Sequence, residues 1–288
     1  MEGILVINKP TGITSTQVVN KVKRKLKTRV GHSGTLDPIA EGILLLLIGK
    51  ATRFSWIFTQ MEKTYYVSAL LGVETDTYDL EGNLLRKKEV NVSCKQLEEI
   101  LREFKGEIQQ QPPPFCAKKV KGKRAYKLAR KGITPPLKPI KVKIYSLKLK
   151  KCHIPHFEIE ASVSSGTYIR SLIHDIGKRL STGAVVSRLI RTRVGPFSLN
   201  DAISLEDFLK SENPKHYLLS TEESLRFLPS VFLDYFHGKK VLNGNTIPLK
   251  DCFREGSVKI YVDNKFVGIG EVKNGLLKPR RLLPIHLT

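Results

Sequence analysis

The spacing of apolar and polar residues predicts a series of short β-strands. In the N-terminal part, strand-like spacing covers residues 4–9 and 63–72, and an unbroken apolar run from Ile43 predicts a buried strand between them. Later in the chain, alternate apolar residues within 157–163 predict another strand, and a further one is predicted from Ala184 on. Together these stretches predict a sheet of several strands.

Helices are predicted between the strands, where apolar residues recur every three to four positions. Ser15 or Thr16 can cap the first helix, and Ser93 and Gln96 have the capping-box spacing of another. A further helix is predicted over residues 164–180. Because strands and helices do not alternate as regular βαβ units, the pattern predicts an α+β fold with a mixed sheet rather than a doubly wound one.

The character of the chain changes near residues 211–220, which are polar and loop-like. From about Pro229 on, short strand signals recur with glycine-containing turns. This predicts a small β-rich module of about 60 residues, near the lower limit for independent folding. Composition leaves two interpretations of the module open, a stabilising C-terminal cap or an accessory RNA-binding unit.

The excess of basic over acidic residues indicates which kind of molecule the protein binds. The chain has 49 Lys and Arg against 27 Asp and Glu, a formal net charge of +22. Such a charge favours nucleic acid as the partner, with an anionic membrane surface as the second possibility. The run from Ile43 is far shorter than the roughly 20 residues that span a bilayer, and the N-terminus lacks the features of a signal peptide. We therefore expect a cytoplasmic protein that does not act at a membrane.

The four cysteines are far apart in the sequence, with no CxxC pair and no metal-ligand spacing. They are Cys94, Cys116, Cys152 and Cys252. The economical interpretation is that all four are reduced thiols and that the protein binds no metal through them.

Basic residues are concentrated in two places. Between Pro112 and Lys151 there are 14 Lys or Arg and no acid, and a second cluster runs from Lys21 to Arg29. A solvated basic face is the ordinary interpretation of such a charge run. The prolines that bracket the first segment, and a short helix ending at Gly132, instead favour a basic flap that closes on a phosphate backbone.

In the segment GHSGTLDPIAEG, residues 31–42, Asp37 is the first acid after Glu2 and follows a strongly basic stretch; Glu41 is the other acid of the segment. Asp37 is framed by Gly31, Gly34 and Gly42, and it precedes a proline. An Asp before Pro is usually a turn former. Tyr65 or Tyr66, at the start of a predicted strand, and Arg170, near the start of a predicted helix, suggest a catalytic role for Asp37 instead. Together they could supply an ionised carboxylate, a partner that holds it, and an aromatic platform for a base.

These residues lie in blocks that carry a resemblance. The blocks NKPTGITS (8–15), GHSGTLDPIAEGIL (31–44), KTYYVSALLGVETDT (63–77), PPPFCAKKVKGKRAYKLAR (112–130) and SSGTYIRSLIHDIG (164–177) resemble the bacterial TruB family. Members of this family are tRNA pseudouridine synthases that modify uridine 55 of the T arm. The resemblance implies a catalytic domain over 1–225 with a basic, thumb-like insertion at about 112–151. It also implies a PUA-like RNA-binding domain over 226–288.

The resemblance also implies a role for each candidate residue. Asp37 would be the catalytic aspartate, Arg170 would pair with it, and Tyr65 would stack on the target base. His32 would help displace the target nucleotide from the RNA stack. The residues expected to support the pocket or contact RNA are Lys9, Pro10, His32, Tyr168, Leu189, Lys118, Lys119, Lys121, Lys123 and Arg124.

The implied reaction converts uridine to pseudouridine without oxidation or gain of a group, so we expect no cofactor and no metal. The expected partner is the T-arm stem-loop of tRNA, bound by a monomer with no obligate protein partner. Two alternatives remain open from the sequence. A non-catalytic RNA-binding or RNA-folding protein would have the same charge, and a metal-dependent nuclease would need clustered acids, for which Asp76 and Asp79 are the nearest pair.

Overall fold

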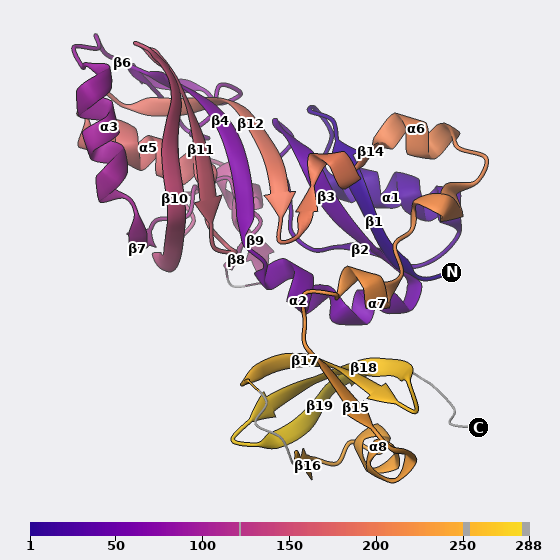
Figure 1. Ribbon diagram of the computed structural model, residues 1–288. Coiled ribbons are helices and arrows are strands. Elements are labelled where there is room, and N and C mark those ends of the chain that lie inside the picture. Colours follow the sequence, from indigo (N-terminus) through magenta and orange to yellow (C-terminus); the bar gives the residue numbers. More distant parts are fainter. Residues whose placement is uncertain (121, 250–253, 284–288) are drawn as a thin grey trace.

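A mixed β-sheet is the framework of the larger part of the molecule (Figure 1). The computed structural model describes residues 1–120, 122–249 and 254–283, so the predicted RNA contact Lys121 lies outside the described residues. Within these ranges the sheet has ten strands. In spatial order they are β14 (Ile203–Ser204), β1 (Gly3–Lys9), β3 (Ala40–Ile48), β12 (Ala184–Val194), β4 (Lys63–Leu71), β11 (His156–Val163), β10 (Ile140–His153) and β7 (Gly106–Gln110), with β2 (Val30–His32) beside β3 and β13 (Phe197–Ser198) beside β12.

The pairing confirms the predicted mixed sheet. β1 runs parallel to β14, and β3 runs parallel to β12, whereas β12 and β4 are antiparallel. Alternate residues of β3 enter two different cores, which is why its sequence is apolar without interruption. Leu44 and Leu46 pack on one face of the sheet, and Ile43 and Leu45 pack on the other.

Helices cover both faces of this sheet. The first core receives apolar residues of α1 (Ser15–Leu26), α3 (Cys94–Glu103), α5 (Ile169–Arg179) and α6 (Leu205–Lys210). The second core is closed by the 3₁₀-helix η1 (Gly49–Phe54) and by α2 (Ser55–Gln60). Among the described residues, no helix is long and apolar enough to cross a lipid bilayer.

The predicted cap of α1 is wrong by one residue. The N-cap is Thr14, which forms a capping box with Gln17, rather than Ser15 or Thr16. The Ser15 hydroxyl is buried and bonds to the backbone of Leu36, so it is not available to cap the helix. The capping box of α3, formed by Ser93 and Gln96, is present as predicted.

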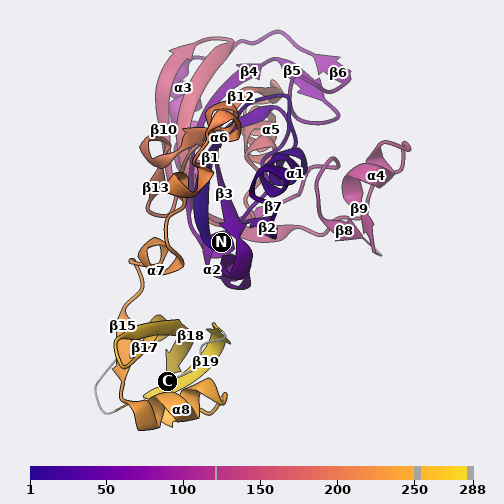
Figure 2. The same ribbon diagram turned by 90° about the vertical axis from the view of Figure 1, so that its right-hand side faces the viewer.

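The basic segment after β7 leaves the sheet and returns to it as β10. It contains the paired strands β8 (Lys119–Val120) and β9 (Lys123–Arg124) and the helix α4 (Ala125–Ala129), which stand apart from the sheet in Figure 2. From Ile140 on, the chain belongs to the sheet, so the part that stands apart ends well before residue 151. β10 has a register shift between Ile144 and Ser146, where its apolar pattern changes phase. The short pair β5 (Val73–Thr75) and β6 (Leu84–Lys87) extends beyond β4.

The C-terminal module forms a second sheet below the first in Figure 1. Its order is β15 (Ser230–Leu233), β17 (Gly256–Val262), β18 (Lys265–Lys273), β19 (Leu276–Leu282) and β16 (Ile247–Pro248). The first strand after Pro229 ends at Leu233, because Asp234 caps a helix, α8 (Tyr235–Leu242), by accepting a hydrogen bond from His237 N. The module also contacts the larger part: the Arg53 guanidinium donates to the Leu282 carbonyl at 2.9 Å, and Ile269 packs into the second core.

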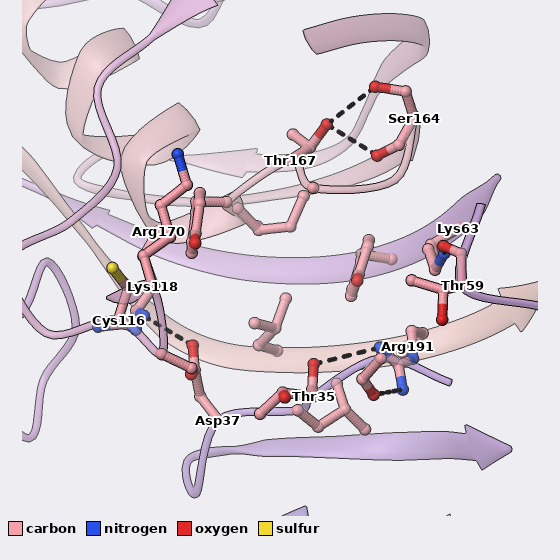
Figure 3. Close-up of a pocket in the computed structure, with 18 residues that line it drawn as sticks. Thr35, Asp37, Thr59, Lys63, Cys116, Lys118, Ser164, Thr167, Arg170 and Arg191 are labelled. Carbon is pink, nitrogen blue, oxygen red and sulfur yellow. Dashed lines mark hydrogen bonds and ion pairs between the residues drawn. The ribbon is translucent and has the colours of Figure 1, made fainter. Parts of the chain in front are cut away.

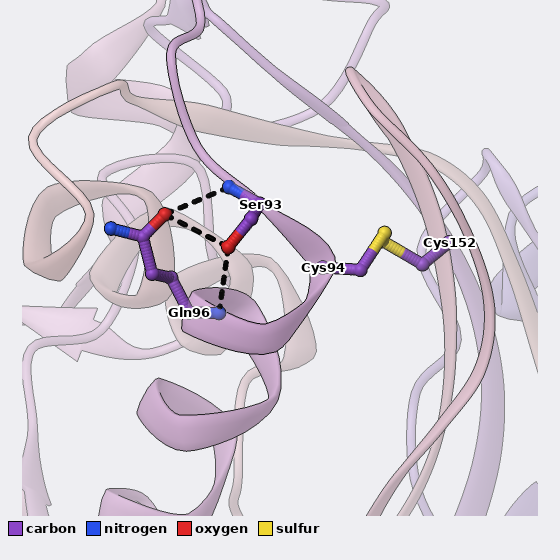
Figure 4. Close-up of a disulfide and its surroundings, with 4 residues drawn as sticks. All are labelled: Ser93, Cys94, Gln96 and Cys152. Carbon is purple, nitrogen blue, oxygen red and sulfur yellow. Dashed lines mark hydrogen bonds between the residues drawn. A yellow bond between two sulfur atoms is a disulfide. The ribbon is translucent and has the colours of Figure 1, made fainter.

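Two of the cysteines form a disulfide, so the prediction of reduced thiols throughout is wrong. Cys94, at the first turn of α3, is bonded to Cys152 near the end of β10 (Figure 4). The two residues are 58 positions apart, and only the packing of α3 on the sheet brings them together. Cys116 is a buried free thiol, and Cys252 lies outside the described residues.

We expect replacement of both Cys94 and Cys152 by serine to lower the free energy of unfolding by about 2–4 kcal/mol, because the bridge restricts the unfolded chain over a loop of 58 residues. Urea unfolding of both proteins without reductant measures the difference. Adding reductant should lower the wild-type midpoint to that of the double variant and leave the variant unchanged. A wild-type midpoint that does not respond to reductant would contradict a stabilising bridge.

Candidate active site

The loop that carries Asp37 is fastened on both sides of this residue. The Ser15 hydroxyl accepts a hydrogen bond from Leu36 N at 2.8 Å and donates one to the Leu36 carbonyl at 2.9 Å. On the other side, Gly12 N donates to the Pro38 carbonyl at 2.8 Å. The backbone immediately before and after Asp37 is therefore held against the segment that joins β1 to α1.

Lys9 lies behind this loop. Its side chain is fully buried, and its ammonium donates to the carbonyls of Pro10 at 2.8 Å, Ile13 at 2.7 Å and Pro38 at 3.4 Å. Burial lowers the pKa of Lys9 to about 8, and the nearby charge of Asp37 partly opposes the shift. Lys9 and Pro10 therefore lie directly behind the Asp37 loop, in a position from which they can support it.

Arg170, on the first turn of α5, contacts Asp37 (Figure 3) and also bonds to two other segments. Its Nε donates to Asp37 Oδ2 at 2.9 Å, its Nη1 donates to the Thr77 carbonyl at 2.7 Å, and its Nη2 donates to the Phe115 carbonyl at 2.9 Å. The Arg170 side chain is 5% exposed, whereas that of Asp37 is 35% exposed. The guanidinium is thus locked in place, and the carboxylate that it orients stays open to the outside.

Asp79 is a second acid beside Arg170, at 3.4 Å between Oδ2 and Nη1. Burial raises the pKa of the Asp79 carboxyl, against the opposing effects of the Thr77 hydroxyl and of Arg170. The sequence places Asp79 in an acidic turn without linking it to the site. The fold supplies that link, because residue 79 pairs with Val186 of β12.

A cavity of about 360 Å³ opens in front of Asp37. Tyr65, which is 8% exposed, and Leu189 of β12 form part of its wall, and burial raises the pKa of the Tyr168 phenol, which also contacts the Cys116 thiol. Six of the predicted residues line this cavity: Asp37, Tyr65, Lys118, Tyr168, Arg170 and Leu189.

Other predicted residues lie outside the cavity. His32 ends β2, and its Nδ1 accepts a hydrogen bond from Gly34 N at 3.3 Å; burial lowers the pKa of this histidine. Lys119, Lys123 and Arg124 are exposed on β8 and β9. These side chains are accessible to a partner, although Arg124 also donates to the Ala117 carbonyl, and they form no part of the pocket.

Two cations that the sequence analysis missed also line the cavity. Lys63 and Arg191 are 5% and 2% exposed, and both occupy inward-facing positions of strands, in phase with Tyr65 and Leu189. A positive charge in phase with the buried residues of an apolar strand is unusual, because such a charge is costly to bury. The presence of these two basic residues at buried strand positions could have identified them from the sequence as candidate site residues.

Comparisons with known proteins identify the family. Residues 21–169 match the model of the TruB family pseudouridylate synthase N-terminal domain, residues 170–226 match the tRNA pseudouridylate synthase B C-terminal domain, and residues 229–283 match a further TruB C-terminal domain. The chain belongs to the TruB family. The resemblance inferred from the sequence blocks is therefore confirmed.

Curated members of the TruB family match this chain over almost its whole length. The tRNA pseudouridine synthase B of Aquifex aeolicus is 52% identical over 286 residues, covering 98% of this chain and 100% of that protein. The protein of the same name from Clostridium kluyveri is 40% identical, covering 98% and 99%.

Solved structures confirm the pseudouridine synthase fold. A chain in a crystal structure of a Cbf5–Nop10–Gar1 complex aligns with a TM-score of 0.74 at 25% identity, covering 97% of this TruB-family chain and 84% of that one. A chain of an H/ACA ribonucleoprotein bound to a substrate RNA that contains 2′-deoxyuridine gives the same TM-score at 24% identity and the same coverage.

Proposed function

We propose that this TruB-family chain converts uridine 55 in the T arm of tRNA to pseudouridine. The observation that carries the proposal is the Arg170–Asp37 pair, which presents one oriented carboxylate to a cavity of about 360 Å³. The relatives named tRNA pseudouridine synthase B support the substrate class. We further propose that the protein acts as a cytoplasmic monomer without a cofactor or an obligate protein partner.

The reaction breaks the bond between ribose C1′ and uracil N1, turns the freed uracil, and joins its C5 to C1′. Asp37 serves either as a nucleophile toward the sugar or the base, or as a base that removes a sugar proton. Both routes need one ionised carboxylate beside the ribose. The guanidinium of Arg170 fixes the direction of the carboxylate, because its own position is set by the Thr77 and Phe115 carbonyls.

The target uridine has to leave its RNA stack before it can enter the cavity. Extruding a nucleotide costs a few kcal/mol, which contacts to the flipped base and to neighbouring RNA offset. Tyr65 provides a ring for the base to stack on, and Leu189 provides an apolar wall. The exposed basic residues of β8 and β9 lie close to Lys118 at the cavity and suit contacts to RNA phosphates.

We expect Asp37→Asn to abolish pseudouridine formation while tRNA affinity stays within about threefold of wild type, since the amide keeps the shape of the side chain but cannot act as a nucleophile or a base. Single-turnover conversion of an unmodified tRNA transcript and a filter-binding assay measure the two quantities. The matched control is Glu212→Gln, which removes a carboxylate from an exposed loop. Substantial turnover by Asp37→Asn would sink the catalytic role, and a fully functional protein would favour the non-catalytic RNA-binding alternative.

Tyr65→Phe and Tyr65→Leu should separate stacking from proton transfer. Phenylalanine keeps the ring, whose stacking on a base contributes about 1–3 kcal/mol, so its RNA affinity should remain near wild type while turnover falls if the hydroxyl moves a proton. Leucine should lower both. Single-turnover assays on the T-arm stem-loop, with melting curves of the same samples, distinguish these effects from a loss of packing.

Tyr66→Phe is the control for these variants, because Tyr66 is the neighbouring tyrosine on the opposite face of β4, where its hydroxyl donates to Glu158. We expect this control to retain full activity. A Tyr65→Phe variant that is stable and fully active would eliminate proton transfer by Tyr65.

A further inference from the structure

Lys63 and Arg191 form a buried cation pair with no carboxylate partner. Among the described residues, no Asp or Glu oxygen lies within 4.0 Å of either side chain. At 5% and 2% exposure, neither charge is well solvated by water. Two buried like charges are costly, so their retention in one cavity calls for a physical reason.

Backbone carbonyls satisfy only part of this pair. The Lys63 ammonium donates to the Thr59 and Met61 carbonyls at 2.5 Å and 2.6 Å, which uses two of its three N–H groups. The Arg191 guanidinium donates to the carbonyls of Ile43 at 2.7 Å, Gly34 at 3.1 Å and Thr35 at 3.4 Å, which uses three of its five. Each side chain therefore keeps hydrogen-bonding capacity and a full positive charge beyond its structural contacts.

The pair borders the surface on which the target base is proposed to stack. Lys63 and Tyr65 occupy alternate positions on the same face of β4, and Arg191 is the residue of β12 directly opposite Tyr65. Gly34 has φ +138°, and a Cβ there would lie 3.7 Å from Arg191 Nη1 and 3.9 Å from Lys63 Cε. The glycine thus keeps a side chain away from both cations.

The cavity is consequently polarised. Figure 3 shows Asp37 and Arg170 together at one side of it, and Lys63 and Arg191 together at the other. On the first side Arg170 is paired with Asp37, Asp79 contacts Arg170 from outside the cavity lining, and Lys118 is a second cation. The second side contains two cations. A nucleoside with its sugar at Asp37 and its base on Tyr65 has its uracil ring beside these two cations.

We propose that the Lys63–Arg191 pair stabilises the negative charge that uracil carries when it separates from the ribose. The inference rests on the proposed function. When the C1′–N1 bond breaks, its electron pair stays with the base, and the charge spreads over the uracil nitrogen and oxygen atoms. The electron-deficient C1′ then either forms a bond to the Asp37 carboxylate or is neutralised when Asp37 removes a proton from the sugar. Fixed cations at the place where charge develops lower the barrier without reorganising.

The uracil anion is discharged within the same cycle. Uracil C5 donates an electron pair to C1′ to form the new C–C bond while the Asp37 carboxylate leaves C1′ or returns the sugar proton; the proton on C5 then leaves, and N1 gains a proton. No oxidant or reductant is needed. The pair therefore assists the first step and releases the base once the charge has gone.

A leaving-group experiment tests the proposal. Fluorine at C5 stabilises the uracil anion, so a T-arm stem-loop with 5-fluorouridine at the target position depends less on the cations than one with uridine. We expect Lys63→Met and Arg191→Met each to lower single-turnover cleavage of the target nucleoside about 100-fold for uridine but about 10-fold or less for 5-fluorouridine. The assay is run at slightly acidic pH and follows loss of the target nucleoside in RNA digests.

Leu189→Ala is the matched control, because Leu189 lines the same cavity without a charge and should slow both substrates equally. If the Met variants lose the same factor in rate on uridine and on 5-fluorouridine, the proposal is overturned. Lys63 and Arg191 would then support the Asp37 loop or bind a phosphate of the RNA backbone. A wild-type protein that forms no pseudouridine from uridine would overturn the proposed function instead.

If the Met variants do not fold, the pH dependence of the wild-type rate provides a second test of the proposal. Burial, together with the charge of Arg191 on β12, lowers the pKa of Lys63 to about 8, and its ammonium donates to the carbonyls of Thr59 on α2 and of Met61 just after it. The wild-type rate on uridine should therefore fall as pH rises through about 8, and the Lys63→Arg variant, which stays charged, should fall less. Lys9 titrates in the same range in both proteins, so their difference reports Lys63. Identical pH profiles would overturn the role of Lys63.

Discussion

The contact between Arg170 and Asp37 is the interaction on which the site depends. One guanidinium gathers a carboxylate from the β2–β3 loop, a carbonyl and a carboxylate from the turn between β5 and β6, and a carbonyl from the basic segment after β7. These segments are distant in sequence, and among the residues that the structure describes no other side chain bonds to all three. Because Arg170 is buried on the first turn of α5, its position is set by the packing of that helix on the sheet.

Several other residues of the larger part of the molecule hold the Asp37 loop in position for this contact. Lys9, Gly12 and Ser15 hold the backbone on either side of Asp37, and Arg191 holds the carbonyls of Gly34 and Thr35 from the opposite side. The loop therefore has little freedom, although Asp37 itself remains accessible. A carboxylate fixed in this way does not have to reorganise before it reacts, which is the condition for efficient electrostatic and nucleophilic catalysis.

Much of this arrangement could be predicted from the sequence, and the remainder has identifiable causes. Apolar spacing predicted the strands, and motif blocks singled out Asp37, Tyr65 and Arg170. The Asp79–Arg170 contact and the Cys94–Cys152 bridge depend on which helices, strands and turns become neighbours in the fold, which local patterns do not specify. Thr14 rather than Ser15 caps α1 because a tertiary contact engages the Ser15 hydroxyl, a competition that local propensity does not include.

The most direct test of the account is the single-turnover rate of an Arg170→Lys variant on an unmodified tRNA transcript. Lysine keeps the charge but cannot hold Asp37, Thr77 and Phe115 at once, so the account predicts a rate about 100-fold below wild type with RNA affinity nearly unchanged. Arg179→Lys, a change on the exposed face of the same helix, should have no effect. A wild-type rate for Arg170→Lys would contradict the account, because a point charge alone would then be enough to hold Asp37.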